Sequence, residues 1–434
     1  MVTTSGSAPS GTGTDGAAAS PETAAPAVRS VFALKDFRYV FAAGATSKFG
    51  TQISYLAIPL LAVTELDASS GQVGALAALS TAAFLLIGLP AGAWVDRMRR
   101  RRLQITADIV RAALFGSVPL AWWLDALTLY QLYAVVLIGG VATVFFDVSN
   151  QSFLPHVVGR ERLGEANARL MSAEAVNSVA GRGAGGYLVQ LITAPLAIGV
   201  NAATYVVSAL CLLRVRRPEP APTRQPGRHL GREILEGARF VLGHPLLRPI
   251  ALEGAATNLA VQMSLTLLPV LFVRELHLSE GLLGAYLGLG GVGAFLGSLC
   301  ARAIGRRLGH GRAMWVIGLA IAPMGALIAR LDRGPALWAA ALAWLAVTFK
   351  IGSDNVIKVT ARQELTPDHL LGRMNATFRF LVTGALAVGS LLAGLLGEFA
   401  GLRAALWTGA GIMAVSWLLI FFSPLRSMRE LPKA

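Results

Sequence analysis

The chain has 434 residues, of which 54% are hydrophobic and only 14% are charged, and its formal net charge is +14. Soluble domains contain about 25% charged residues, so this composition excludes an ordinary soluble domain and indicates a helical integral membrane protein, in which the distribution of positive charge matters more than its sum. The only cysteines, Cys211 and Cys300, fall in apolar segments, which argues against a disulfide framework and a cysteine metal site.

The first 33 residues are rich in Ser, Thr, Gly, Ala and Pro. They lack the basic start and the apolar core of a secretory signal, so we expect a disordered cytoplasmic tail at 1–33. Twelve segments that can cross a bilayer follow. The expected spans are residues 37–63, 73–95, 103–123, 129–148, 167–191, 195–213, 247–273, 282–304, 313–329, 336–360, 374–398 and 402–422.

A polar break separates the sixth span from the seventh. The stretch "RVRRPEPAPTRQPGRHL" indicates an exposed linker, and "GREILEGARFVLGHPLL" after it indicates an amphipathic helix on the inner leaflet. The sequence therefore predicts an all-α integral membrane protein with two six-helix bundles, at 34–214 and 247–424. A cytoplasmic linker at 215–246 joins the bundles, and a cytoplasmic tail occupies 425–434.

The basic residues alternate between the two sides of the predicted membrane. Clusters such as 97–102 and 306–312 fall in even-numbered gaps between spans, whereas the first three odd-numbered gaps hold only Glu65, Asp67 and Asp125 as charged residues. Because Lys and Arg stay on the cytoplasmic side, we predict a multi-pass protein of the cell membrane with both termini in the cytoplasm.

The two halves repeat a motif. "GLPAGAWVDRMRRRRLQ" follows the second span and contains Gly92, Asp96 and Arg97, and "GSLCARAIGRRLGHGR" follows the eighth span, with Ala301 in the place of Asp96. A second repeat links "FLPHVVGRERLGEANARL" with "ELTPDHLLGRMNATFRF". Two parallel halves of six helices are typical of a transporter.

These stretches, together with "LKDFRYVFAAGATSKFG", "GAGGYLVQ" and "ILEGARFVLGHPLLR", resemble the major facilitator superfamily, in the branch of macrolide efflux proteins and the enterobactin exporter. The resemblance implies proton-coupled export of a small amphipathic molecule, such as an antibiotic or siderophore, by alternating access. It implies no cofactor beyond the proton gradient, and a monomer whose partners are the small-molecule substrate and the bilayer, without nucleic acid. Two alternatives stay open: uptake of an anionic solute, and a sensor or lipid-handling protein on the same scaffold.

The resemblance also gives the arginine-rich turn a role. It implies that Gly92, Asp96 and Arg97 form a cytoplasmic latch, in which the Asp96 carboxylate meets the positive end of a helix in the other half. The alternative is that the arginines only anchor the topology, because basic residues at a cytoplasmic end need no further purpose.

Charges inside the spans are the main pointers to function. Asp108 and Arg111 are three residues apart, so we expect them to share a helix face as a structural pair. By resemblance, the first, fourth, seventh and tenth helices line a central cavity. The substrate-cavity candidates are Lys48, Gln52, Arg182, Asn258, Gln262 and Lys350, and the proton-coupling candidates are Glu174, Glu253 and Asp354.

For several of these charges a structural role is an equal alternative. Lys48, Arg182 and Lys350 fit a cavity and an ion pair about equally well, whereas Asp147 and Lys358 are expected to be structural, near the cytoplasmic ends. The chain also departs from the family, with Arg182 where a proline is usual and Asn201 where an Asp is frequent. No phosphate-cradling G-x-x-x-x-G-K-[ST] loop, nucleophile–base arrangement or metal-ligand spacing occurs, which argues against ATP coupling, an enzyme and a metal site.

Overall fold

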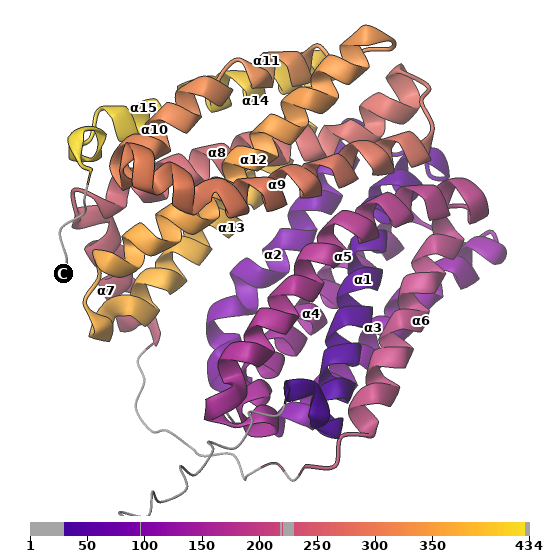
Figure 1. Cartoon of the computed structure of the whole chain (residues 1–434). Coiled ribbons are helices and arrows are strands. Elements are labelled where there is room, and N and C mark those ends of the chain that lie inside the picture. The colour runs from indigo at the N-terminus through magenta and orange to yellow at the C-terminus, as the bar shows by residue number, and fades with distance from the viewer. Residues whose placement is uncertain (1–29, 96, 218, 220–229, 430–434) are drawn as a thin grey trace, which may run out of the picture.

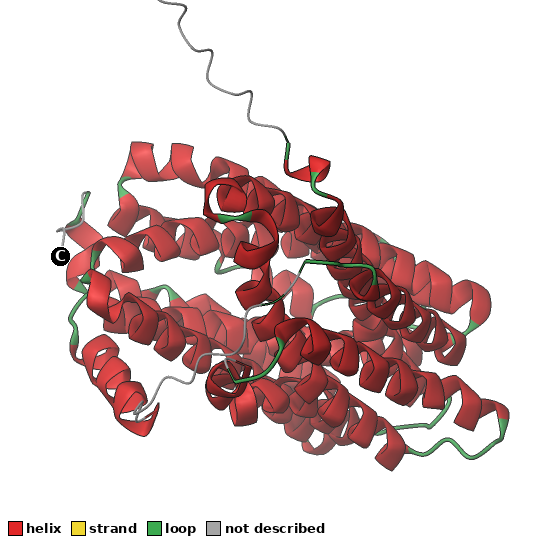
Figure 2. Ribbon diagram, turned by 90° about the horizontal axis from the view of Figure 1, so that it is seen from below, coloured by secondary structure: helices red, strands yellow, loops and turns green. Residues whose placement is uncertain are grey.

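The computed structural model describes residues 30–95, 97–217, 219 and 230–429, and within these ranges it contains helices, turns and loops but no strand. The view from below in Figure 2 shows long helices packed side by side. Among the described residues, ten helical stretches are long and apolar enough to cross a membrane. Two further long helices, Lys35–Thr64 and Leu163–Ile192, contain polar candidates named above. Lys48 and Gln52 lower the mean hydropathy of the first helix, and Glu174 and Arg182 lower that of the second.

The first six predicted spans correspond one to one to the helices of an N-terminal bundle (Figure 1). Two short 3-10 turns, η1 (Val31–Ala33) and η2 (Arg160–Arg162), precede α1 and α5. The helices are α1 (Lys35–Thr64), α2 (Ser70–Val95), α3 (Arg100–Trp123), α4 (Leu129–Val158), α5 (Leu163–Ile192) and α6 (Ala194–Leu213).

The C-terminal bundle follows a short helix, α7 (Leu230–Gly243). Its elements are α8 (Leu247–Val270) with the π-turn η3 (Leu271–Glu275), α9 (Glu280–Leu308), α10 (His310–Ile321), α11 (Met324–Ala329), α12 (Pro335–Glu364), η4 (Asp368–Leu370), α13 (Leu371–Phe399), α14 (Leu402–Ser416), α15 (Leu418–Phe421) and η5 (Pro424–Ser427). Two predicted spans are each split in two. The ninth breaks before Pro323, which has no N–H to continue a helix, and the last breaks at Trp417.

The two bundles touch through glycines at one end of the molecule, here named the closed end, which carries the α1–α2 connection at 65–69. Helix α5 meets α9 there, and a Cβ added to Gly186 would lie 2.6 Å from the Cα of Gly284. Helix α2 meets α13 in the same way, since a Cβ on Gly394 would lie 2.8 Å from the Cα of Gly74. The absence of side chains allows these backbones to come into direct contact.

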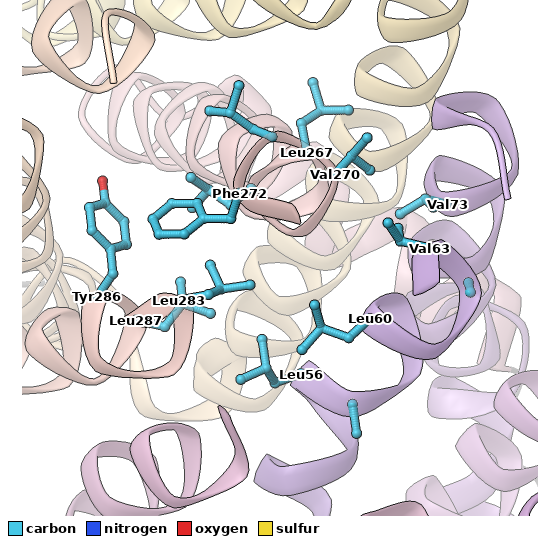
Figure 3. Packing of buried hydrophobic residues seen from close by; sticks show 14 of the residues in the cluster. Leu56, Leu60, Val63, Val73, Leu267, Val270, Phe272, Leu283, Tyr286 and Leu287 are labelled. Atoms are coloured by element: carbon cyan, nitrogen blue, oxygen red, sulfur yellow. The ribbon is translucent and has the colours of Figure 1, made fainter. Parts of the chain in front are cut away.

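An apolar core fills the space beside these glycine contacts. Figure 3 shows Leu56 and Leu60 of α1 facing Leu283 and Leu287 of α9, with Phe272 of η3 above Leu283 in this view. All of these side chains are at most 3% exposed, and they belong to one cluster drawn from both bundles. Hydrocarbon surface from both halves therefore seals the closed end.

The opposite end, here named the open end, carries the arginine-rich turn and the short helix α7. At this end the helices of the two bundles stand apart in Figure 1. Helix α7 packs on α13, and Glu236 accepts a 2.8 Å ion-pair hydrogen bond from Arg373. Its Val241 is buried, whereas Leu235 and Leu242 are exposed, which leaves an apolar strip free on the helix.

Candidate functional site

The N-terminal bundle encloses a polar cavity of about 170 Å³ between four of its helices. A neighbouring cavity of about 420 Å³ shares Lys48, Glu174 and Asn177 with it and extends past Leu154 toward the open end. We call the two together the N-half cavity. The smaller part is lined by Ser47, Lys48, Thr51, Gln52, Arg111, Thr143, Phe146, Asp147, Glu174 and Asn177.

Lys48 and Glu174 form an ion pair across this cavity. The Lys48 Nζ of α1 lies 2.8 Å from the Glu174 Oε2 of α5, and the two side chains are 37% and 50% exposed. A pair this open to water contributes only about 0–1 kcal/mol. It can therefore open at little cost when a proton or a ligand competes for either partner.

Asp147 of α4 lines the same cavity, and it forms no hydrogen bond or ion pair with any residue that the structure describes. The cations in electrostatic range of it are Lys48, Arg111 and, from the other bundle, Arg379. The expectation for Asp147 was a place near a cytoplasmic helix end. That placement is wrong, because α4 continues to Val158, so Asp147 lies well inside a helix and faces the cavity.

Asp108 and Arg111 of α3 form a fully buried pair behind the cavity. Arg111 donates to Asp108, and Ser208 of α6 donates to the other carboxylate oxygen at 2.7 Å. The Arg111 guanidinium also lies over the rings of Phe146 and Tyr205, at 4.4 Å and 4.3 Å. A buried pair with such partners is neutral and fixed, as the spacing of the two residues predicts.

Gln52 and Arg182 join α1 to α5 deeper in the bundle. The Arg182 Nε donates to the Gln52 Oε1 at 3.2 Å, and the guanidinium lies 5.4 Å from the ring centre of Tyr55. Among the described residues Arg182 has no carboxylate partner. Asn201, by contrast, is completely buried and donates to Ser54 at 2.6 Å, within the bundle.

The C-terminal bundle places its charges differently. Glu253 of α8 binds both Lys350, at 2.8 Å, and Lys358 of α12. Asp354 binds the same two lysines, at 2.5 Å and 2.8 Å. Thr257 adds a hydrogen bond to Glu253 at 3.0 Å. We call Glu253, Lys350, Asp354 and Lys358 the charge quartet.

The quartet has no net formal charge and is largely closed to water. The side chains of Glu253 and Lys350 are only 1% and 3% exposed. For Lys350, a free positive charge in a cavity and an ion pair were equal alternatives. Its position between two carboxylates supports the ion pair, because an unpaired charge at such a depth is costly.

A smaller cavity of about 80 Å³ reaches the edge of the quartet from the C-terminal bundle. It is lined by Asp354 and Lys358 and by Asn258, which donates to the Gly254 carbonyl at 2.8 Å. Arg362 also lines it and stacks over Phe378 at 4.4 Å.

A third cavity, also about 80 Å³, lies between the bundles beneath the apolar seal. Tyr55, Ile58 and Leu76 supply part of its N-terminal wall. Gln262 of α8 faces it and donates to Ser390 of α13 at 3.1 Å. This space is mostly apolar and has a few hydroxyl and amide groups.

Of the expected latch, the structure describes Gly92 and Arg97, and Asp96 lies outside the described residues. Gly92 has open space around it, and Arg97 is exposed in the turn after α2. Nearby, Arg101 donates to the carbonyl of Leu212 at 2.9 Å and so ties α3 to the end of α6. Within the described ranges, no group of three or more His, Cys, Asp or Glu side chains could hold a metal ion.

Comparison with known proteins gives the same fold. The family model described as Major Facilitator Superfamily matches residues 40–357. The chain is 27% identical over 404 residues to the multidrug efflux pump Tap of Mycolicibacterium fortuitum, covering 90% of this chain and 96% of that one. It is 27% identical over 402 residues to the enterobactin exporter EntS of Citrobacter koseri, covering 91% and 94%.

A solved structure of the nucleoside transporter NupG superposes with a TM-score of 0.73 at 13% identity, over 90% of this chain and 99% of that one. The predicted fold class, twelve spans in two six-helix bundles, is confirmed by the helices and these matches.

Proposed function

Because the chain belongs to the Major Facilitator Superfamily, and so is a multi-pass membrane transporter and not an enzyme, we propose that it exports a small amphipathic molecule by alternating access, driven by protons. The direction is supported by the two relatives, one named an efflux pump and the other an exporter. An amphipathic substrate is favoured because the protein has one cavity lined by charged residues and another lined mostly by apolar residues. Charged side chains of the N-half cavity would contact the polar part of the substrate. Tyr55, Ile58 and Leu76 of the cavity beneath the seal would contact its apolar part.

The observation that carries the proposal is the arrangement of Lys48, Asp147 and Glu174 around one cavity. The cavity is lined by two carboxylates, and among the described residues only Glu174 forms an ion pair with a cation. Low access to water favours a neutral carboxylic acid, and a nearby cation favours the ionised form. A cavity that opens first to one side and then to the other would therefore let these carboxylates take up and release protons. The charge quartet is closed and neutral, which makes it the weaker candidate for this task.

Asp147→Asn and Glu174→Gln should each abolish uphill transport. In inverted membrane vesicles, substrates are screened with and without an imposed proton gradient, and the variants are then assayed on the best substrate. Accumulation in each variant should fall to the level seen without a gradient, because the group that couples the proton is gone, while downhill exchange should continue.

The matched control is Glu364→Gln, which removes an exposed carboxylate at the open end and should keep gradient-driven accumulation. Full uphill transport by both cavity variants would refute the coupling site. A wild-type protein that moves no compound in either direction would refute export itself.

We further propose that the open end faces the cytoplasm, so that the structure represents an inward-facing state. Arginine-rich connections gather at this end, whereas Glu65, Asp67 and Asp125 lie in connections at the closed end, and Lys and Arg favour the cytoplasmic side. Asp96, with Gly92 and Arg97, then stays our candidate for a cytoplasmic latch. The residues Gln52, Arg182, Asn258 and Gln262 stay candidates for contact with substrate.

Reporter fusions test this orientation directly. A fusion after Asp125 should report the external side, with alkaline phosphatase active and the fluorescent protein dark. A fusion after Ala434 should report the cytoplasm, with the opposite signals. The opposite pattern would place the open end on the external side. The same side for both fusions would contradict the predicted number of spans between them.

A further inference from the structure

A basic pocket lies at the open end of the N-terminal bundle, where α1 begins and α6 ends. It has a volume of about 690 Å³ and is separate from the N-half cavity. Its polar wall consists of Lys35, Asp36, Tyr39, Arg214, Arg216 and Arg217. These residues come from two segments nearly 180 positions apart in the chain, which the fold brings together.

Most of the positive charge in this pocket is uncommitted. Four basic side chains and one carboxylate leave a formal charge of +3. Arg217 donates to the Val157 carbonyl at 2.6 Å, and Asp36 accepts from the backbone N–H of Arg216 at 3.1 Å. Across the part of the chain that the structure describes, the side chains of Lys35, Arg214 and Arg216 form no hydrogen bond or ion pair.

Part of the pocket lining is apolar. Leu34, Val157 and Leu213 lie beside the basic residues, and Leu213 is the last residue of α6 and is 55% exposed. The end of a membrane-spanning helix lies near the boundary between hydrocarbon and headgroups. Tyr39 fits this level as well, because tyrosine is enriched at membrane interfaces.

We infer that the basic pocket binds the phosphate-bearing headgroup of an anionic lipid, with an acyl chain along Leu34 and Leu213. Basic pockets between helix ends are suited to such headgroups. Simple anchoring of the topology needs no concave site. Arg101 nearby shows what a committed arginine does, since it donates to carbonyl groups of α6. Lys35, Arg214 and Arg216 instead line an open volume.

The test measures binding of a fluorescent phosphatidylglycerol to the full-length protein in neutral detergent, with a matched phosphatidylcholine probe. The wild type should prefer phosphatidylglycerol. The triple variant Lys35→Gln/Arg214→Gln/Arg216→Gln should bind it about a hundredfold more weakly, since each basic residue near a membrane surface contributes roughly a fivefold gain in affinity. The single variant Arg214→Gln should lose about fivefold and guards against a folding defect in the triple variant.

A matched control removes the same charge elsewhere at the open end. Arg306→Gln/Arg307→Gln/Arg312→Gln changes three exposed cations of the C-terminal bundle and should leave binding within about twofold. Equal losses in both triple variants, or equal binding of the two probes by the wild type, would overturn the proposal. Inorganic phosphate is added as a competitor. Weak competition supports a lipid, and competition at the affinity of the lipid would overturn it in favour of a free-anion site.

Discussion

Glu253→Leu should destabilise the protein by about 3–5 kcal/mol, which is the usual result of removing one partner from a buried ion pair. Glu253 lies on α8 and forms ion pairs with Lys350 and Lys358 of α12, and its side chain is only 1% exposed. Without it, two lysines share the single carboxylate of Asp354, and a net positive charge is left in a nearly dry space. The thermal denaturation midpoint of the purified protein in detergent should fall accordingly.

The double variant Glu253→Leu/Lys350→Met separates this effect from a simple loss of packing. It restores neutrality, because Lys358 and Asp354 still pair at 2.8 Å, so most of the lost stability should return. The control Glu174→Gln breaks a half-exposed pair and should cost less than about 1 kcal/mol. A double variant as unstable as the single one would show that the charge balance of the quartet does not matter.

Gly186→Ala should slow the transport cycle strongly without unfolding either bundle. An added Cβ would lie 2.6 Å from both the Gly284 Cα and the Glu280 carbonyl oxygen, whereas carbon atoms pack at about 3.5–4.0 Å. Helices α5 and α9 would have to separate at the closed end. Overpacking of this kind costs about 1–3 kcal/mol. The cost falls only on the state in which the bundles touch there, so its population and the transport rate should drop about 5–150-fold.

Gly183→Ala is the matched control, because it is the same substitution one turn away on α5 and its Cβ would have no atom within 4 Å. Spin labels on the connections that follow α5 and precede α9, with Cys211 and Cys300 replaced by Ser, measure the separation. The label distance should increase for Gly186→Ala and stay unchanged for Gly183→Ala. Identical distances and rates in the two variants would contradict a closing role for the glycine contact.

Sequence patterns predicted the helices well, because a bilayer demands about 20 apolar residues for each span. Their lengths were predicted less well. Residue 148 was the expected end of the fourth span, yet α4 runs to Val158, since hydropathy marks the thickness of the hydrocarbon and a helix can extend beyond it. The polar stretch after residue 148 therefore hid the position of Asp147 inside the helix.

The pairing of charges between helices was beyond the sequence. Helical spacing places Asp108 beside Arg111, and the structure contains that pair. The partnership of Lys48 with Glu174 depends on how α1 and α5 pack, and that of Lys350 with Glu253 depends on α8 and α12. Packing between helices leaves no periodic signal in a single sequence. A cavity role and an ion pair therefore fitted Lys48 and Lys350 equally well, and only the three-dimensional structure shows their partners.

The charge quartet is nearly closed to water, whereas the Lys48–Glu174 pair is open to it. This difference in exposure suggests different rigidity for the two bundles. The quartet is held by four mutual contacts at 11% exposure or less, so adding or removing one proton there would disturb an interlocked unit. The Lys48–Glu174 pair stands in a water-accessible space, where a proton can arrive without breaking any packing. The protein would then work as a stator and a rotor. Under the proposed proton coupling, the C-terminal bundle would be the fixed frame, and proton binding in the N-terminal bundle would start its movement against that frame.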